Sequence, residues 1–111
     1  MPYAYKKGRK DNAQKAVEDV LKSTSIPYSD TSGLGNGFPD LVVHWRGVNL
    51  LVEIKNPKQR DDLTAAETRF FAMVAITGAP LIIATEAQDI FDWFNDRVDK
   101  QYQNERITES E

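Results

Sequence analysis

Three segments carry apolar residues at intervals of three and four positions, a spacing that places them along one side of a helix. These segments span 12–24, 65–77 and 87–100. Asp11 and Thr64 precede the first two as N-caps, and Gln14 and Glu67 are placed to complete capping boxes. The inner side of the second helix is expected to hold Ala66, Phe70, Met73, Val74 and Thr77.

Short unbroken apolar runs predict strands that are covered on both faces. They are Leu41–Val43, Leu50–Val52 and Leu81–Ala84, preceded by a short edge strand at Ile26–Tyr28. A tight turn at Arg46-Gly47 makes the first two runs an antiparallel hairpin. The helix over 65–77 is a right-handed crossover, which makes the second and third runs parallel. We therefore expect an α/β fold, with a mixed central β-sheet flanked by helices on both faces in the order αβββαβα.

The length of 111 residues fits one domain with a modest core. We expect a basic arm over 1–10, a single domain over 11–100 and a polar tail over 101–111. The absence of cysteine excludes disulfides and cysteine-based zinc sites. We find neither a secretory signal nor an apolar run of the roughly 20 residues that span a bilayer. The expectation is a cytoplasmic protein that does not contact membranes, in a bacterial, archaeal or phage-encoded context.

The net charge of −3 and the pI near 5.2 argue at first against a nucleic-acid partner. The distribution of charge weakens that argument, because acidic residues are concentrated in the last twenty positions. Basic residues gather at two places: Lys6, Lys7, Arg9 and Lys10, and then Lys55, Lys58 and Arg60. The first cluster is either a solvated terminus or a set of phosphate contacts.

Charged residues collect at one end of the predicted hairpin. Asp40 opens its first strand, and Glu53 and Lys55 close the second on a shared face. Two carboxylates suit Mg²⁺, which prefers hard oxygen ligands, and the carbonyl of Ile54 offers a third oxygen. Lys55 would then stabilise charge at a scissile phosphate. The alternative is a surface ion pair between Glu53 and Lys55, which contributes little to stability.

The strings Gly37-Phe38-Pro39-Asp40-Leu41 and Leu51-Val52-Glu53-Ile54-Lys55 resemble two motifs of the PD-(D/E)XK nuclease superfamily. Within it, the chain is most similar to small stand-alone VRR-NUC (virus-type replication-repair nuclease) domains over roughly residues 9–86. The segment Lys7-Gly8-Arg9-Lys10 and the step Ser32-Gly33 also resemble archaeal Holliday-junction resolvases. The resemblance implies a restriction-endonuclease-like fold.

The resemblance also implies roles for individual residues. Asp40 and Glu53 match the ligands of Mg²⁺ or Mn²⁺, with no small-molecule cofactor, and Lys55 matches the catalytic lysine. Glu18 matches an acidic residue that the first helix adds to the same site; read from its helix alone, Glu18 is a surface glutamate paired with a lysine. Glu67 departs from the family pattern, which has glutamine there, so we assign it only to the capping box. We expect DNA contacts from Lys6, Lys7, Arg9, Lys10, Asn36, Lys58 and Arg60.

The resulting hypothesis is a homodimeric, metal-dependent DNA endonuclease that resolves Holliday junctions. Trp93, expected on the exposed side of the last helix, is a candidate for the dimer surface. One alternative is a less selective DNA nuclease of flap or restriction type. Another is a DNA-binding module that keeps this fold without the reaction.

Overall fold

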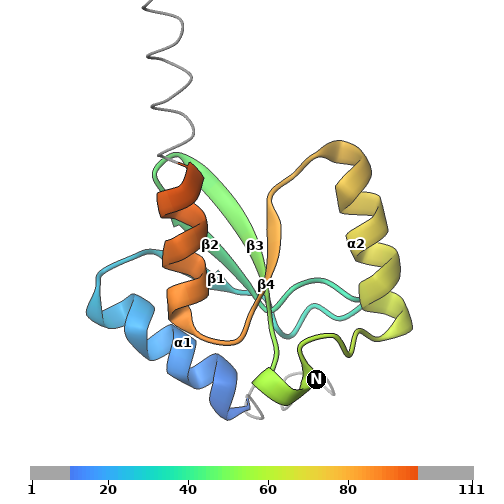
Figure 1. Cartoon of the computed structure of the whole chain (residues 1–111), viewed down its shortest axis with the longest axis horizontal. Helices are drawn as coiled ribbons and strands as arrows, with labels where there is room; N and C mark the ends of the chain where they lie inside the picture. The colour runs from blue at the N-terminus through green and yellow to red at the C-terminus, as the bar shows by residue number, and fades with distance from the viewer. Residues whose placement is uncertain (1–10, 98–111) are drawn as a thin grey trace, which may run out of the picture.

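The computed structural model describes residues 11–97, which form a four-stranded sheet with helices packed around it (Figure 1). The elements are α1 (Asn12–Ser23), β1 (Tyr28–Asp30), β2 (Leu41–Trp45), β3 (Val48–Ile54), the 3₁₀ turn η2 (Pro57–Gln59), α2 (Ala65–Thr77), β4 (Leu81–Ala84) and a helix over 87–97. The α/β class and the mixed sheet are therefore confirmed.

The strands lie in the order β1-β2-β3-β4. β1 and β3 each pair antiparallel with β2, and β4 pairs parallel with β3. Arg46 and Gly47 both adopt positive φ, of 50° and 76°, which is the geometry of a two-residue type I′ hairpin turn. This turn fixes the register, in which Leu41 lies opposite Val52. Continuing that pairing by one residue places Asp40 opposite Glu53, so the expected charged end of the hairpin is formed.

The caps of α2 follow the prediction closely. The Thr64 hydroxyl accepts from the backbone N–H of Glu67, and the Glu67 carboxylate accepts from the backbone N–H of Thr64. Gly78 ends the helix in the left-handed conformation. Asp11 caps the first helix as expected, but the prediction that Gln14 completes a capping box is wrong. The Gln14 side chain instead donates to the Glu18 carboxylate one turn further on.

The hydrophobic core lies on one face of the sheet, under α1 and the helix over 87–97. It contains Val17, Leu21, Leu41, Val43, Leu50, Val52, Ile54, Ile90 and Phe94. The other face is covered less completely: Val42, Leu51 and Ile83 are only half-buried. In Figure 1, α2 lies on that side, across the sheet from the helix over 87–97. The expectation that both faces of the strands are fully buried is therefore wrong for the α2 side.

Two expectations about packed and exposed side chains are also corrected. Only Val74 is buried on α2, whereas Met73 and Thr77, expected inside, are exposed. Trp93, expected to be exposed, packs edge-on against Phe94 with ring centroids 5.0 Å apart. It is therefore part of the core's margin and does not form a free surface.

Several expectations concern parts of the chain outside the described residues. They are the basic arm over 1–10 with Lys6, Lys7, Arg9 and Lys10, the end of the last helix over 98–100, and the tail over 101–111. Within 11–97, none of the helices has the length and apolar character needed to cross a bilayer.

Candidate metal centre

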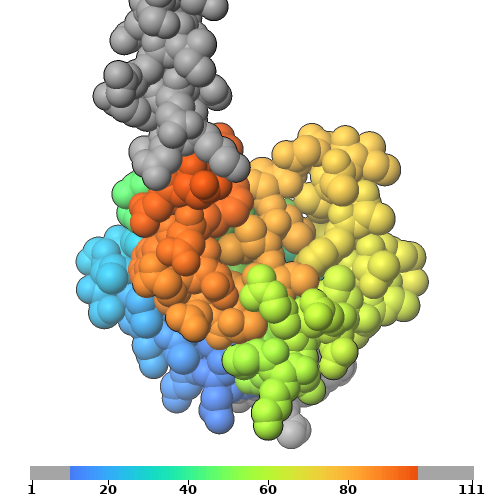
Figure 2. Space-filling view, in the orientation of Figure 1, coloured from blue at the N-terminus to red at the C-terminus, as the bar shows by residue number. Residues whose placement is uncertain are grey.

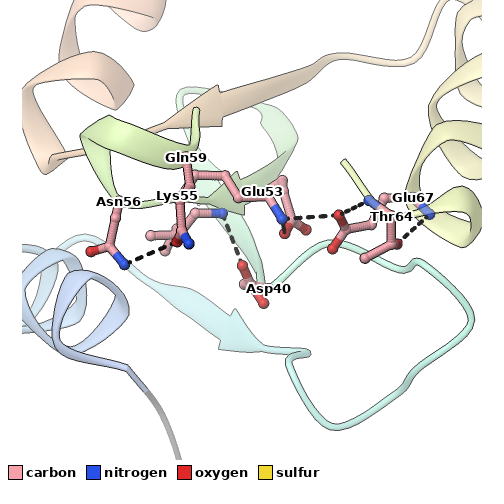
Figure 3. A network of polar contacts seen from close by, with 8 residues as sticks. Asp40, Glu53, Lys55, Asn56, Gln59, Thr64 and Glu67 are labelled. Atoms are coloured by element: carbon pink, nitrogen blue, oxygen red, sulfur yellow. Dashed lines mark hydrogen bonds and ion pairs between the residues drawn. The ribbon is translucent and has the colours of Figure 1, made fainter. Parts of the chain in front are cut away.

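Asp40 and Glu53 lie side by side where β2 begins and β3 ends (Figure 3). The Asp40 carboxylate accepts a hydrogen bond of 2.9 Å from the backbone N–H of Ile54, which holds it against the end of β3. Glu53 is almost completely buried, and its Oε1 atom has no hydrogen-bond partner. A buried carboxylate oxygen without a partner is rare in folded proteins, so the Glu53 Oε1 atom is a candidate for contact with a cation or polar ligand.

The surroundings of Asp40 and Glu53 raise the pKa of both carboxyl groups. Burial, followed by the negative charges of Asp40 and Glu67, raises the pKa of Glu53 to about 8. Burial also raises the pKa of Asp40, although the hydrogen bond from Ile54 acts in the opposite direction. The charges of Asp11 and Glu67 add to the increase for Asp40. A divalent cation between Asp40 and Glu53 would offset both the burial of these charges and the repulsion that adds to the shifts.

Lys55 projects from the end of β3 toward the carboxylates of Glu53 and Glu67 (Figure 3). Its Nζ atom lies 3.5 Å from Glu53 Oε2 and donates a 2.9 Å hydrogen bond to Glu67 Oε1. Burial alone would lower the pKa of Lys55, but the hydrogen bond to Glu67 and the charges of Glu53 and Glu67 leave it raised. Lys55 is therefore a fully charged ammonium group at neutral pH, held in place by two acids.

Glu67 has a larger part in the site than its capping role suggests. The same Oε1 atom accepts from Lys55 Nζ and from the backbone N–H of Thr64, each at 2.9 Å. Burial acts to raise the pKa of Glu67, but the hydrogen bonds from Thr64 and Lys55 outweigh burial and lower it. The sequence carried a signal for this contact, because a capping box fixes the Glu67 carboxylate at the helix start that follows β3.

Glu18 occupies a different polar cluster. It is buried in α1, where its carboxylate accepts from Gln14 Nε2 at 3.0 Å and from the Tyr28 hydroxyl at 2.8 Å. Tyr28 lies opposite Val43, which points into the core, whereas Glu53 points to the other face of the sheet. Within residues 11–97, no group of three or more histidine, cysteine, aspartate or glutamate side chains is arranged to hold a metal ion. The role of Glu18 as a third ligand stays a prediction.

Two of the residues expected to contact DNA, Lys58 and Arg60, lie around the 3₁₀ turn η2. Lys58 and Arg60 lie in and directly after η2, where both are exposed. Arg60 Nη1 is 3.9 Å from Asp89 Oδ2. A cleft of about 460 Å³ is lined by Asn56, Pro57, Lys58 and Gln59, the residues that follow Lys55 in the chain.

The loop between β1 and β2, which contains Gly33, Gly35 and Gly37, packs closely against α2. Asn36 is exposed and adopts a positive φ of 57°. At Gly37, a Cβ atom would lie 2.3 Å from the backbone oxygen of Ala66, so this loop approaches the first turn of α2 closely. The backbone of this loop therefore packs directly against α2.

His44, the single histidine, has partners on both ring nitrogens. Nε2 is 2.8 Å from the Ser29 hydroxyl, and Nδ1 is 2.8 Å from the Asn49 side-chain oxygen. These contacts link three neighbouring strands across the sheet. They give His44 a structural role, because its ring joins the three strands by side-chain hydrogen bonds.

Comparison of the chain with protein-family models, with curated proteins and with solved structures found no match. A function for this protein therefore has to be argued from the arrangement of Asp40, Glu53, Lys55 and Glu67.

Proposed function

We propose that this protein is a divalent-metal-dependent deoxyribonuclease whose reaction centre is built by Asp40, Glu53 and Lys55. The observation that carries the proposal is the buried Glu53 Oε1 atom without a partner, next to a second carboxylate and an ammonium group. Leaving such an oxygen unpaired costs roughly 1–3 kcal/mol. A cation bound there would remove that cost; without a cation, burial and the neighbouring acids instead raise the pKa of Glu53 to about 8.

The donor set fits Mg²⁺ or Mn²⁺. Both carboxylates offer hard oxygens, and Mg²⁺ in proteins is commonly bound by one or two carboxylates together with water and substrate phosphate. The carbonyl of Ile54, between Glu53 and Lys55, would provide a further oxygen. When bound, the ion supplies charge neutralisation at the phosphodiester and activation of water. Asp40 and Glu53 hold and orient it.

Lys55 acts on the substrate. Its ammonium group carries a full positive charge and reaches the space beside Glu53, where it can donate a hydrogen bond to a non-bridging oxygen of the scissile phosphate. Negative charge grows on that oxygen as the phosphorus is attacked, so the contact strengthens in the transition state. Glu67 is a positioning residue, because it holds Lys55 by a 2.9 Å hydrogen bond.

The surroundings of Lys55 suit a phosphodiester backbone. Asn56–Gln59, the residues that follow Lys55 in the chain, line a cleft. Lys58, which lines it, and Arg60, the next residue after Gln59 in the chain, are both exposed. Lys6, Lys7, Arg9 and Lys10 add a second basic cluster in the sequence. Lys and Arg side chains that neutralise phosphates provide most of the sequence-independent affinity for DNA.

The substrate class follows from the motif resemblance. We propose a restriction-endonuclease-like arrangement of the α/β fold, and branched DNA, above all four-way junctions, as substrate. A junction resolvase makes two symmetric nicks and therefore acts as a homodimer.

The proposal is tested by incubating the full chain with end-labelled four-way junction, flap and linear duplex DNA, in Mg²⁺, in Mn²⁺ and in EDTA. We expect metal-dependent cleavage, strongest on the junction. Equal cleavage of all three substrates would favour the less selective nuclease. Lys55→Ala should slow cleavage by about 100-fold or more, because an electrostatic contact in the transition state is lost. Lys58→Ala, a control outside the reaction centre, should mainly weaken DNA binding.

One observation favours the non-catalytic alternative. Glu18 is engaged by Gln14 and Tyr28, and the described residues contain no group of three acidic or histidine side chains that could hold a metal. A chain that binds junctions in EDTA and cleaves nothing in Mg²⁺ or Mn²⁺ would establish this alternative and overturn the nuclease proposal.

A further inference from the structure

Two side-chain amides lie beside the candidate metal centre. Asn56 directly follows Lys55 in the chain, and its Nδ2 atom donates a 3.4 Å hydrogen bond to Gln59 Oε1. Figure 3 shows this pair on the opposite side of Asp40 from Glu67. The proposed reaction gives the two amides no task, because it uses only the carboxylates and the ammonium group of the centre.

The backbone that carries the two amides is held by local hydrogen bonds. Pro57 opens η2, and its ring restricts φ. The backbone N–H of Gln59 donates to the carbonyl of Asn56 at 2.8 Å, and the N–H of Asp62 donates to the carbonyl of Gln59 at 3.0 Å. A ligand that meets the two amides therefore finds their backbone already in place.

The same residues line a cleft of about 460 Å³, which is bordered by Asn56, Pro57, Lys58 and Gln59. Pockets for small ligands have volumes of roughly 300–1,000 Å³, so the cleft is large enough for a nucleobase. All four residues are exposed, and Figure 2 shows the light-green segment that contains them on the surface of the molecule. A ligand can therefore reach both amides from solvent.

The chemistry of the amides selects the edge of a DNA base. An Asn or Gln amide matches adenine, because its oxygen accepts from the N6 amino group while its nitrogen donates to N7. Gln59 Oε1 has two lone pairs, and the hydrogen bond from Asn56 uses one of them. Within residues 11–97 the Gln59 amide makes no other hydrogen bond. The second lone pair and the Nε2 group are therefore available for a bidentate contact with adenine.

We infer that Gln59 reads an adenine base next to the scissile phosphate, and that Asn56 is a positioning residue that orients the Gln59 amide. The base is placed there because Asn56 directly follows Lys55, which contacts the scissile phosphate in the proposed reaction. Lys58, on the same cleft, contacts a neighbouring phosphate. The inference rests on the proposed function, since it takes DNA as the substrate, and it adds a sequence preference at the cut.

The test measures binding and cleavage separately. Four-way junctions with randomised bases around the branch point are bound to the full chain in EDTA, and the bound fraction is sequenced. We expect enrichment of adenine at one position, with an affinity about 10-fold or more above that for the other bases. In Mg²⁺ or Mn²⁺, the cut should lie beside this adenine.

Variants assign the preference to the amides. Gln59→Ala should abolish the enrichment of adenine, and Asn56→Ala should reduce it. Lys58→Ala should weaken binding about equally for all sequences and keep the preference, because phosphate contacts carry no sequence information. Gln88→Ala, the matched control, removes an exposed glutamine outside the cleft and should keep the preference. An adenine analogue with carbon in place of N7 should weaken binding to the wild type but not to Gln59→Ala. Far-UV circular dichroism verifies that each variant is folded.

The outcomes separate this inference from the nuclease proposal. Binding without a base preference, enrichment of a base other than adenine, a cut away from the selected adenine, or a preference that Gln59→Ala retains would overturn the inference and leave the nuclease proposal standing. A chain that selects adenine in EDTA but cleaves nothing in Mg²⁺ or Mn²⁺ would overturn the nuclease proposal and keep Gln59 as the residue that reads the base. A chain that binds no DNA would overturn both.

Discussion

Glu67 shows how one side chain can serve a helix and the candidate metal centre together. Its carboxylate closes the capping box of α2 and also accepts the hydrogen bond from Lys55. The capping role was predictable because it depends on residues three positions apart. The contact with Lys55 links residues twelve positions apart and needs the crossover from β3 to α2 to bring them together. Sequence reasoning therefore found only the local half of its role.

The two roles of Glu67 can be separated by a pair of variants. Thr64→Ala and Glu67→Ala should each destabilise the protein by about 1 kcal/mol, because each breaks the capping box. Only Glu67→Ala removes the hydrogen-bond partner of Lys55, so it alone should slow cleavage and lower the pKa of Lys55, which limits activity on the alkaline side. Denaturant unfolding and pH–rate profiles measure the two effects. Matching pH–rate profiles for the two variants would contradict a positioning role.

The raised pKa of Glu53 predicts how the stability of the metal-free protein changes with pH. Its pKa is raised from 4.5 to about 8 in the folded state. The folded chain therefore holds this proton more tightly than the unfolded chain does, and the resulting stability, complete below pH 4.5, is lost as the pH rises through about 8. In EDTA, the Tm of the wild type should fall relative to that of Glu53→Gln between these values. A constant difference between the two Tm curves would refute the shift.

The elements were predicted best where their signals are local. The hairpin turn at Arg46-Gly47 and both ends of α2 follow from backbone and capping preferences of neighbouring residues. The failures concern tertiary packing. The loop between β1 and β2 contacts the backbone of Ala66 at the start of α2, a tertiary contact that no local sequence pattern indicates. Because α2 is apolar on more than one side, its sequence does not reveal which side is buried. The prediction that Met73 lies inside was therefore wrong.

The loop between β1 and β2 offers a test of how α2 is held. Gly35 and Gly37 both have positive φ, so an alanine at either position costs about 1–2 kcal/mol. At Gly37 the added Cβ would also clash with the backbone of Ala66, whereas at Gly35 nothing lies within 4 Å. Urea unfolding should show that Gly37→Ala is less stable than Gly35→Ala by about 1–3 kcal/mol. Equal losses would mean that the loop does not fix α2.

At the scale of the whole molecule, the two sides of the sheet have different tasks. The side under α1 and the helix over 87–97 carries the core. The α2 side carries Glu53 and Lys55 at one end and the partly covered residues Val42, Leu51 and Ile83 beside them. In this account, the first side supplies stability and the second supplies the proposed chemistry. The net charge of −3 did not reveal this division, because it averages over regions with different functions.

The claim on which the account depends is that Asp40 and Glu53 bind a divalent cation. The most direct measurement is titration of the full chain with Mn²⁺, with free Mn²⁺ followed by electron paramagnetic resonance. The account predicts saturable binding by the wild type and by Asp62→Asn, an exposed acid outside the centre, and its loss in Asp40→Asn and Glu53→Gln. A wild-type chain that binds no Mn²⁺, or Asp40→Asn and Glu53→Gln variants that bind it as well as the wild type, would contradict the account.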